Sequence, residues 1–133
     1  MQKLCLFLAL MLFSFIVWVI FMANTGQDML LFKVTRQIPF GDKLGHIFVF
    51  GGLTLMGNLA FKGKVLNWKL GSVYWGTAAV LIFVTLEELS QHFVATRSLD
   101  LLDYLANLVG ILSFTWLSKE VMKKASFFNK ASY

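Results

Sequence analysis

The chain has 133 residues, of which 58% are hydrophobic, and its formal net charge is +5. A chain of this length forms one domain, and it is too short to bury so many large apolar side chains in a water-soluble core. The basic residues are spread among apolar segments, so we expect them to set membrane topology and not to bind nucleic acid. Cys5 is the only cysteine, which excludes an intramolecular disulfide and a cysteine-based metal cluster.

The first apolar run, Leu4 to Ala23, is uncharged and has the length of a bilayer span. It is too long for a typical signal peptide, and its end lacks the small-x-small cleavage pattern. We therefore expect an uncleaved helix near 4–23. The polar connection that follows is interrupted by an apolar stretch at 29–32, which is a candidate for the membrane interface.

Three further apolar runs predict helices near 43–61, 70–89 and 99–118. The first of them contains several glycines, which favour close helix packing. The other two have apolar cores of about 26 Å, slightly shorter than the hydrocarbon layer, so the acids at their ends belong to the helices or to the membrane boundary. The predicted fold is one all-α domain over residues 1–133, a polytopic bundle of four transmembrane helices.

Loop charges predict the orientation of this bundle. The amino terminus, the 62–69 loop and the tail together hold eight basic residues, whereas the opposite side holds four. The positive-inside rule then predicts a multi-pass protein of the cell membrane with both termini in the cytoplasm. Four aromatic residues near the cytoplasmic ends of the spans are typical of an aromatic belt: Trp68, Tyr74, Trp75 and Trp116.

Six of the seven acidic residues, Asp28 among them, fall on the predicted outer side. Asp100, Asp103 and Asn107 follow one another at spacings of three and four, which places them on one face of the 99–118 helix. A role as helix N-cap accounts for Asp100. It does not account for Asn107, which lies about 10 Å deeper along the axis. A polar side chain at that depth is expected to face protein or water.

Two adjacent carboxylates, Glu87 and Glu88, lie near the end of the 70–89 helix. The helix dipole disfavours negative charge there and the carboxylates repel each other, so protonation, a cation or a metal ion must offset them. Arg97, the only basic residue between this helix and the next, is the best cation in the sequence. Because neighbouring helical residues diverge by about 100°, we expect Glu88 to face inward and Glu87 to face water.

The helix near 43–61 begins with its own polar group. Asp42 and His46 are four residues apart and share a face, which predicts either a structural hydrogen bond between them or a chemical role. Lys43 is expected to extend outward to the membrane surface.

Four short motifs carry a resemblance to a known family: Gly41-Asp42-Lys43-Leu-Gly-His46, Glu88-Leu-Ser-Gln91, Arg97-Ser-Leu-Asp100-Leu-Leu-Asp103 and Asn107-Leu-Val-Gly110. In residue type, order and spacing they resemble the VanZ-like family over roughly residues 40–117. The chain differs from that family at Ala95-Thr96, where the family often has Pro-Gly, and at Phe114, where it often has a small residue.

The resemblance implies a small bacterial membrane protein, and the family's founding member is associated with resistance to teicoplanin, a glycopeptide antibiotic. It also implies a set of characteristic polar positions, which form the predicted cluster: Asp42, Lys43, His46, Glu88, Gln91, Arg97, Asp100, Asp103 and Asn107. No bound metal and no cofactor is predicted.

Three functions are compatible with these features, in descending order of preference. The first is a non-enzymatic envelope protein whose polar cluster binds an envelope ligand or organises the bundle. The second is an intramembrane enzyme that uses the carboxylates and the histidine for acid–base chemistry on a lipid-linked or cell-wall substrate. The third is a transporter or proton path, for which four helices are few unless the protein oligomerises. The expected partners are the lipid bilayer and the envelope ligand.

Overall fold

The computed structural model describes residues 2–27, 29–69, 71–95 and 97–130. Asp28, Leu70 and Thr96, on which sequence predictions fall, lie outside these ranges. The described residues form five helices and one hairpin: α1 (Gln2–Asn24), α2 (Leu30–Gln37), α3 (Gly41–Ala60), β1 (Val65–Trp68), β2 (Gly71–Tyr74), α4 (Trp75–Gln91) and α5 (Leu101–Lys130). The prediction of a mostly helical fold is confirmed.

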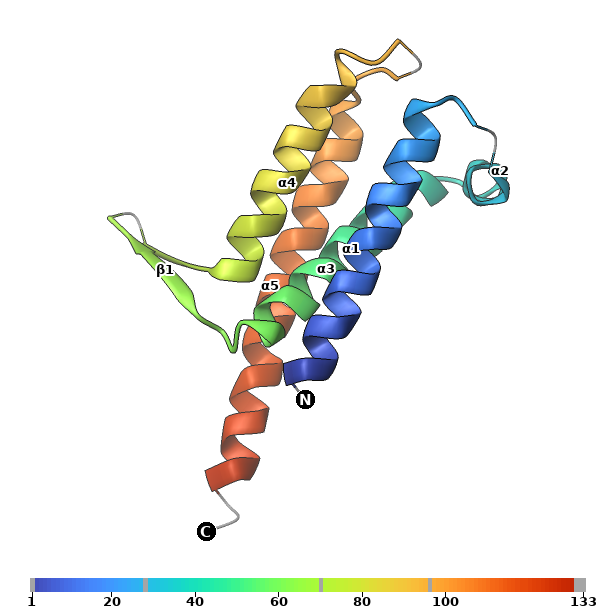
Figure 1. Ribbon diagram of the computed structural model, residues 1–133. Helices are drawn as coiled ribbons and strands as arrows, with labels where there is room; N and C mark the ends of the chain where they lie inside the picture. The colour runs from blue at the N-terminus through green and yellow to red at the C-terminus, as the bar shows by residue number, and fades with distance from the viewer. Residues whose placement is uncertain (1, 28, 70, 96, 131–133) are drawn as a thin grey trace.

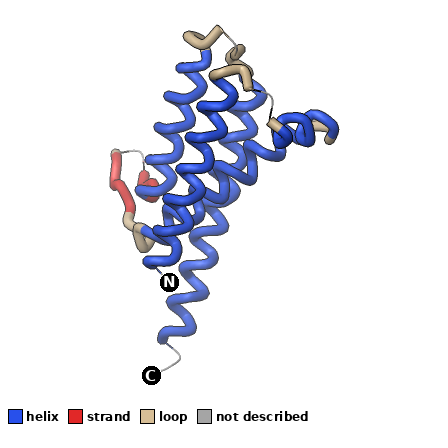
Figure 2. Tube along the Cα trace, turned by 45° about the vertical axis from the view of Figure 1, so that its right-hand side comes forward, coloured by secondary structure: helices blue, strands red, loops and turns tan. Residues whose placement is uncertain are grey.

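Four long helices pack together, with α3 at the centre. It contacts α1 on one side and α4 and α5 on the other, and α4 also packs along α5. Both termini lie at the lower end in Figure 1, and α4 joins α5 at the upper end. The short helix α2 lies beside the upper half of the bundle, outside the packed helices, as Figures 1 and 2 show.

Glycines allow α3 and α5 to approach each other closely. A Cβ atom added at Gly110 would lie 2.9 Å from the Cα of Ile47, so backbone meets backbone at this point. A Cβ atom added at Gly51 would lie 2.8 Å from ring atoms of Phe114. The bulky residue that departs from the VanZ-like pattern on α5 is therefore accommodated by a glycine on α3.

The segment before α4 corrects the predicted helices. The helix expected near residue 70 begins at Trp75, because the residues before it form an antiparallel hairpin in which Val65 pairs with Tyr74. Lys62, with a φ of 54°, turns the chain after α3, and Gly71, with a φ of 138°, opens the second strand. The valine and aromatic residues of the strands favour extended backbone. These local preferences override the apolar pattern that suggested a longer helix.

The last helix is also longer than predicted, since it continues past residue 118 to Lys130. The 29–32 stretch proposed for the interface begins a separate helix, α2, on which Leu30 and Val34 are exposed. A short helix with exposed apolar side chains suits a membrane surface.

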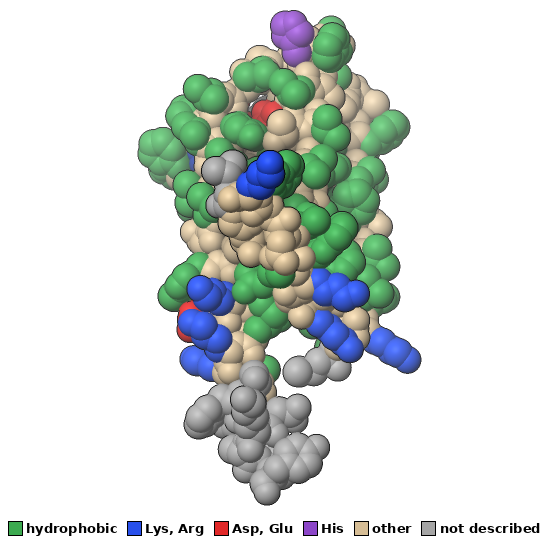
Figure 3. Space-filling model, turned by 90° about the vertical axis from the view of Figure 1, so that its left-hand side faces the viewer, with side chains coloured by type: hydrophobic (Ala, Val, Ile, Leu, Met, Phe, Trp, Pro, Cys, Tyr) green, Lys and Arg blue, Asp and Glu red, His purple; other side chains and the backbone are tan. Residues whose placement is uncertain are grey.

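Among the residues that the structure describes, two helices are long and apolar enough to cross a membrane: Gln2–Asn24 and Leu101–Ala125. Four spans were expected; α3 and α4 do not meet this test, and α4 has only 17 residues. The exposed surface is rich in large apolar side chains, such as Phe7 and Phe21 on α1 and Leu112 and Trp116 on α5. In water such a surface would be unfavourable, whereas lipid accommodates it. Figure 3 shows hydrophobic side chains over the upper part of one face and lysines toward its lower end.

The interior contains an apolar core and, nearer the termini, a buried polar network. The core includes Ile16, Phe50, Leu53, Val80, Val84 and Ile111. In the network, the Asn58 amide nitrogen donates to the hydroxyls of Thr77 (3.0 Å) and Ser118 (3.2 Å), and the Thr77 backbone N–H donates to the Asn58 amide oxygen (2.9 Å). These bonds connect α3, α4 and α5 at one point, as interhelical polar contacts do in membrane proteins.

Candidate functional site

The polar residues singled out in the sequence come together where α3 begins, α4 ends and α5 begins. The close contact between Ile47 and Gly110 brings α3 and α5 together at this level. His46 directly precedes Ile47, and Asn107 lies one turn before Gly110. Together with Glu87, these residues are called the polar cluster below: Asp42, Lys43, His46, Glu87, Glu88, Gln91, Arg97, Asp100, Asp103 and Asn107.

Lys43 joins three carboxylates and does not extend outward as predicted. Its ammonium contacts Asp42 at 2.9 Å, Asp100 at 3.0 Å and Asp103 at close range. Only 20% of its side chain is exposed, which makes an inward pair more favourable than a surface one. The lysine thus ties the start of α3 to the start of α5.

Asp100 acts as the predicted cap of α5. Its carboxylate accepts the backbone N–H of Leu102 at 2.8 Å, and it also contacts Lys43. The lysine, followed by the Leu102 N–H, lowers the pKa of the Asp100 carboxyl below its ordinary value. The carboxylate is therefore held in its charged form at the helix N-terminus, where the dipole favours it.

A hydrogen-bonded chain leads from His46 into the bundle. His46 Nδ1 lies 2.9 Å from the Asn107 amide oxygen, and the Asn107 amide nitrogen donates to Glu88 Oε1 at 3.3 Å. Because the asparagine nitrogen is engaged with Glu88, its oxygen is the acceptor for histidine, so Nδ1 carries the proton. His46 Nε2 faces Asp103 at 3.7 Å. The predicted hydrogen bond between His46 and Asp42 does not form, because His46 bonds to Asn107 and Asp42 to Lys43.

Glu88 is buried, with 3% of the residue exposed, and its second carboxylate oxygen has no hydrogen-bond partner among the described residues. Buried polar atoms are nearly always hydrogen-bonded, because leaving one unsatisfied costs free energy. Glu88 faces inward as expected, toward α5, and its neighbourhood carries an electrostatic cost that the rest of the bundle must offset.

Glu87 is also buried, which corrects the expectation that it faces water. It is 7% exposed, each of its carboxylate oxygens accepts from the Gln91 amide nitrogen, at 3.0 and 3.1 Å, and it lies 3.6 Å from Arg97. Arg97 therefore pairs with Glu87 and not with Glu88. The two glutamates lie on different faces of α4. Glu88 is covered by α5, whereas Glu87 is covered by Gln91 and Arg97 and lies at the wall of a cleft.

That cleft has a volume of about 520 Å³ and is lined by α1, α2, α3, the end of α4, Arg97 from the following loop and the start of α5. Small-molecule sites usually occupy roughly 300–1,000 Å³. Its apolar wall includes Phe15, Ile16, Val19, Ile20, Leu31, Phe32, Val49 and Phe50, and the ionisable residues that line it are Asp42, His46, Glu87, Arg97 and Asp103.

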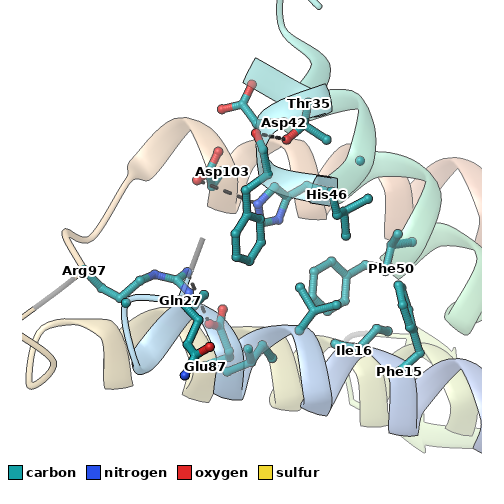
Figure 4. Close-up of a pocket in the computed structure, with 18 residues that line it drawn as sticks. Phe15, Ile16, Gln27, Thr35, Asp42, His46, Phe50, Glu87, Arg97 and Asp103 are labelled. Carbon is teal, nitrogen blue, oxygen red and sulfur yellow. Dashed lines mark hydrogen bonds and ion pairs between the residues drawn. The ribbon is translucent and has the colours of Figure 1, made fainter. Parts of the chain in front are cut away.

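Figure 4 shows Asp103 and Arg97 at one end of the cleft, with Glu87 across from Asp103, and Phe15, Ile16 and Phe50 at the other end. His46 lies between the two ends, and its ring is stacked on that of Phe50 with the centroids 5.9 Å apart. The site therefore has a charged end and an apolar end, which is the polarity of an amphiphilic molecule.

Sequence reasoning did not identify the α1 and α2 walls or the role of Glu87. The α1 wall consists of ordinary apolar residues, and only long-range packing against α3 turns this stretch into one side of a cleft. The inward position of Glu87 had one signal in the sequence, since Arg97 is the only basic residue in the loop after α4.

The chemistry available here is ionic pairing, hydrogen bonding and proton transfer. Within the described parts of the chain, no three histidine, cysteine, aspartate or glutamate side chains are grouped so that they could hold a metal ion. Comparisons of this chain with protein-family models, with curated proteins and with solved structures find no match.

Proposed function

We propose that this protein is a VanZ-like membrane protein that crosses the bilayer four times, with both termini in the cytoplasm. The apolar surfaces of α1 and α5 support membrane insertion, and α3 and α4 pack in the same bundle. The exposed lysines at the lower end support the orientation, because positive residues are retained in the cytoplasm. The polar cluster is then at the outer face.

At that face the protein binds an amphiphilic ligand of the cell envelope, with its polar head at the charged end of the cleft and its chain along the apolar wall. The observation that carries this proposal is the separation of charged and apolar residues along one cleft. Aliphatic chains are stabilised by burial against Ile16, Val49 and Phe50, at about 0.8 kcal/mol per methylene group. A rigid network such as that of Lys43 preorganises the charged end, which lowers the cost of binding.

The test is to fill the apolar end of the cleft. Val49 lines the cleft, whereas Val109 on α5 is 52% exposed on the outside of the bundle. Protein purified in detergent is mixed with a dioleoyl phospholipid, and retained lipid is counted by native mass spectrometry. We expect Val49→Trp to lose a lipid that the wild type and Val109→Trp retain. Equal retention by Val49→Trp would mean that the cleft is not the binding site.

The resemblance to the VanZ-like family adds a physiological proposal, that the protein lowers susceptibility to teicoplanin. The minimal inhibitory concentration is measured in a sensitive bacterial host that expresses the wild type, Glu88→Gln or Asp103→Asn. Higher resistance with the wild type alone, at equal protein levels in the membrane, supports a site that acts on the envelope. Loss of the variant proteins from the membrane would assign the cluster to bundle assembly, and unchanged susceptibility with the wild type would reject the link to resistance.

A second candidate function is acid–base catalysis, favoured by the geometry of His46. The Asn107 amide oxygen accepts from Nδ1, so Nε2, on the side of Asp103 and the cleft, is the ring nitrogen left for acid–base chemistry. Wild-type protein and His46→Gln are incubated with a bacterial lipid extract, which is then compared by mass spectrometry. Conversion of a lipid by the wild type alone supports an enzyme, and identical extracts leave ligand binding as the function.

A further inference from the structure

The charged end of the cleft holds more negative than positive charge. Lys43 contacts Asp42, Asp100 and Asp103, and Arg97 contacts Glu87. Counted at their formal charges, these four carboxylates and two cations leave an excess of two negative charges. In a partly buried site this excess is poorly screened, so a ligand that brings a positive charge is favoured.

The geometry of Lys43 leaves carboxylate surface for such a cation. The lysine uses one oxygen of each aspartate, namely Oδ2 of Asp42, Oδ2 of Asp100 and Oδ1 of Asp103. Of the three residues, Asp42 and Asp103 line the cleft, and Asp103 Oδ2 lies on the side of His46. The cleft therefore presents carboxylate oxygens on the wall formed by α3 and α5.

Arg97 offers the opposite charge on the other side of the charged end. Its guanidinium nitrogen lies 3.6 Å from Glu87 Oε1, which is an ion pair but is longer than a hydrogen bond. Only 21% of the Arg97 side chain is exposed, and the residue lines the cleft. A guanidinium in this position has donors that match the oxygens of a phosphate.

We propose that the head of the bound amphiphile is a phosphoethanolamine zwitterion, as in phosphatidylethanolamine, and this rests on the proposed function of the cleft. The primary ammonium group donates to the carboxylates of Asp42 and Asp103, and the phosphate accepts from Arg97. A choline head lacks N–H donors, so it cannot donate a hydrogen bond to these carboxylates. An anionic glycerol head would add to the negative excess.

The experiment compares three lipids with the same two oleoyl chains, whose heads are phosphoethanolamine, phosphocholine and phosphoglycerol. Each is titrated into the full-length protein in detergent, and its dissociation constant is measured by native mass spectrometry. We expect the ethanolamine lipid to bind on the order of tenfold more tightly than the other two, because hydrogen bonds to charged groups contribute that much.

Two variants assign the head to its partners. Asp42→Asn removes one carboxylate whose side chain is 53% exposed, so folding should tolerate it, and it should reduce the preference for ethanolamine over choline. Arg97→Gln should weaken all three phospholipids to a similar extent. Glu120→Gln is the control, because Glu120 lies at the opposite end of α5 and pairs with Lys123. It should change neither the preference for ethanolamine nor the affinity for the three lipids.

The outcomes separate the two proposals. Equal affinity for the three lipids would overturn the head-group assignment and leave the amphiphile site in place. Failure of every lipid to bind would overturn both. An ethanolamine preference that survives in Asp42→Asn, or affinities for all three lipids that Arg97→Gln leaves unchanged, would place the head away from the polar cluster and also overturn the assignment.

Discussion

The contact between α3 and α5 provides the sharpest test of the structure, because it positions the polar cluster. A Cβ at Gly110 would lie 2.9 Å from the Cα of Ile47 and 3.0 Å from its carbonyl carbon, with the carbonyl oxygen nearer still. A backbone cannot rotate away as a side chain can, so Gly110→Ala must separate the two helices. Overpacking costs about 1–3 kcal/mol, and the gain in helix propensity offsets about 1 kcal/mol of it. The net loss is therefore between about 0 and 2 kcal/mol, and we expect a value of about 2 kcal/mol because the contact is with backbone.

Gly45 on α3 is the matched control, since a Cβ added there meets nothing within 4 Å. Gly45→Ala should therefore keep or raise stability through helix propensity alone, by up to about 1 kcal/mol. Both variants are unfolded thermally in the same detergent and followed by far-UV circular dichroism. The apparent Tm should fall for Gly110→Ala and stay level or rise for Gly45→Ala. If the two variants unfold at the same temperature, the close approach of α3 and α5 is wrong.

Three other predictions follow from the described contacts. Asn58→Leu removes the side chain that joins three helices and takes away the acceptor of the buried Thr77 backbone N–H, so unfolding in detergent should show a loss of about 1–2 kcal/mol. The lowered pKa of Asp100 means that its pair with Lys43 stabilises the protein above the ordinary value of 3.8, and this contribution is lost as the pH falls through the folded pKa. Asp100→Asn should accordingly have a lower Tm than the wild type at neutral pH, and its Tm should fall less as the pH is lowered. Parallel curves of Tm against pH for the two proteins would contradict the pair. In a cysteine-free background, an impermeant thiol reagent should label Ser98→Cys in intact cells and Lys64→Cys only after permeabilisation, whereas labelling of residue 64 in intact cells would reverse the proposed orientation.

The sequence alone predicts the helical class and the approximate position of each long helix. A run of about 20 apolar residues without charges leaves no other option in lipid than a helix, because every backbone group must be hydrogen-bonded within the segment. The helix ends were less accurate around residues 65–74. There, hydropathy indicates an apolar helix, whereas valines, aromatic residues and the backbone at Lys62 and Gly71 favour a hairpin.

The polar cluster was predictable as a set of residues but not as a set of pairs. Spacing along one helix places Asp103 and Asn107 on one face. Charge alone could not decide that Lys43 turns inward to three aspartates or that Arg97 selects Glu87 over Glu88. Those choices depend on how closely two helices approach and on which face of α4 is covered.

What the sequence determined by itself is thus local: apolar length, helical periodicity and the charge of each loop. The tertiary structure decided what depends on residues far apart in the chain. The glycine contact between α3 and α5 brings His46 to Asn107, and the position of α1 against α3 turns plain apolar residues such as Ile16 into one wall of a cleft. The physical reason is that periodicity fixes the face on which a side chain lies, whereas only close packing fixes what that face meets.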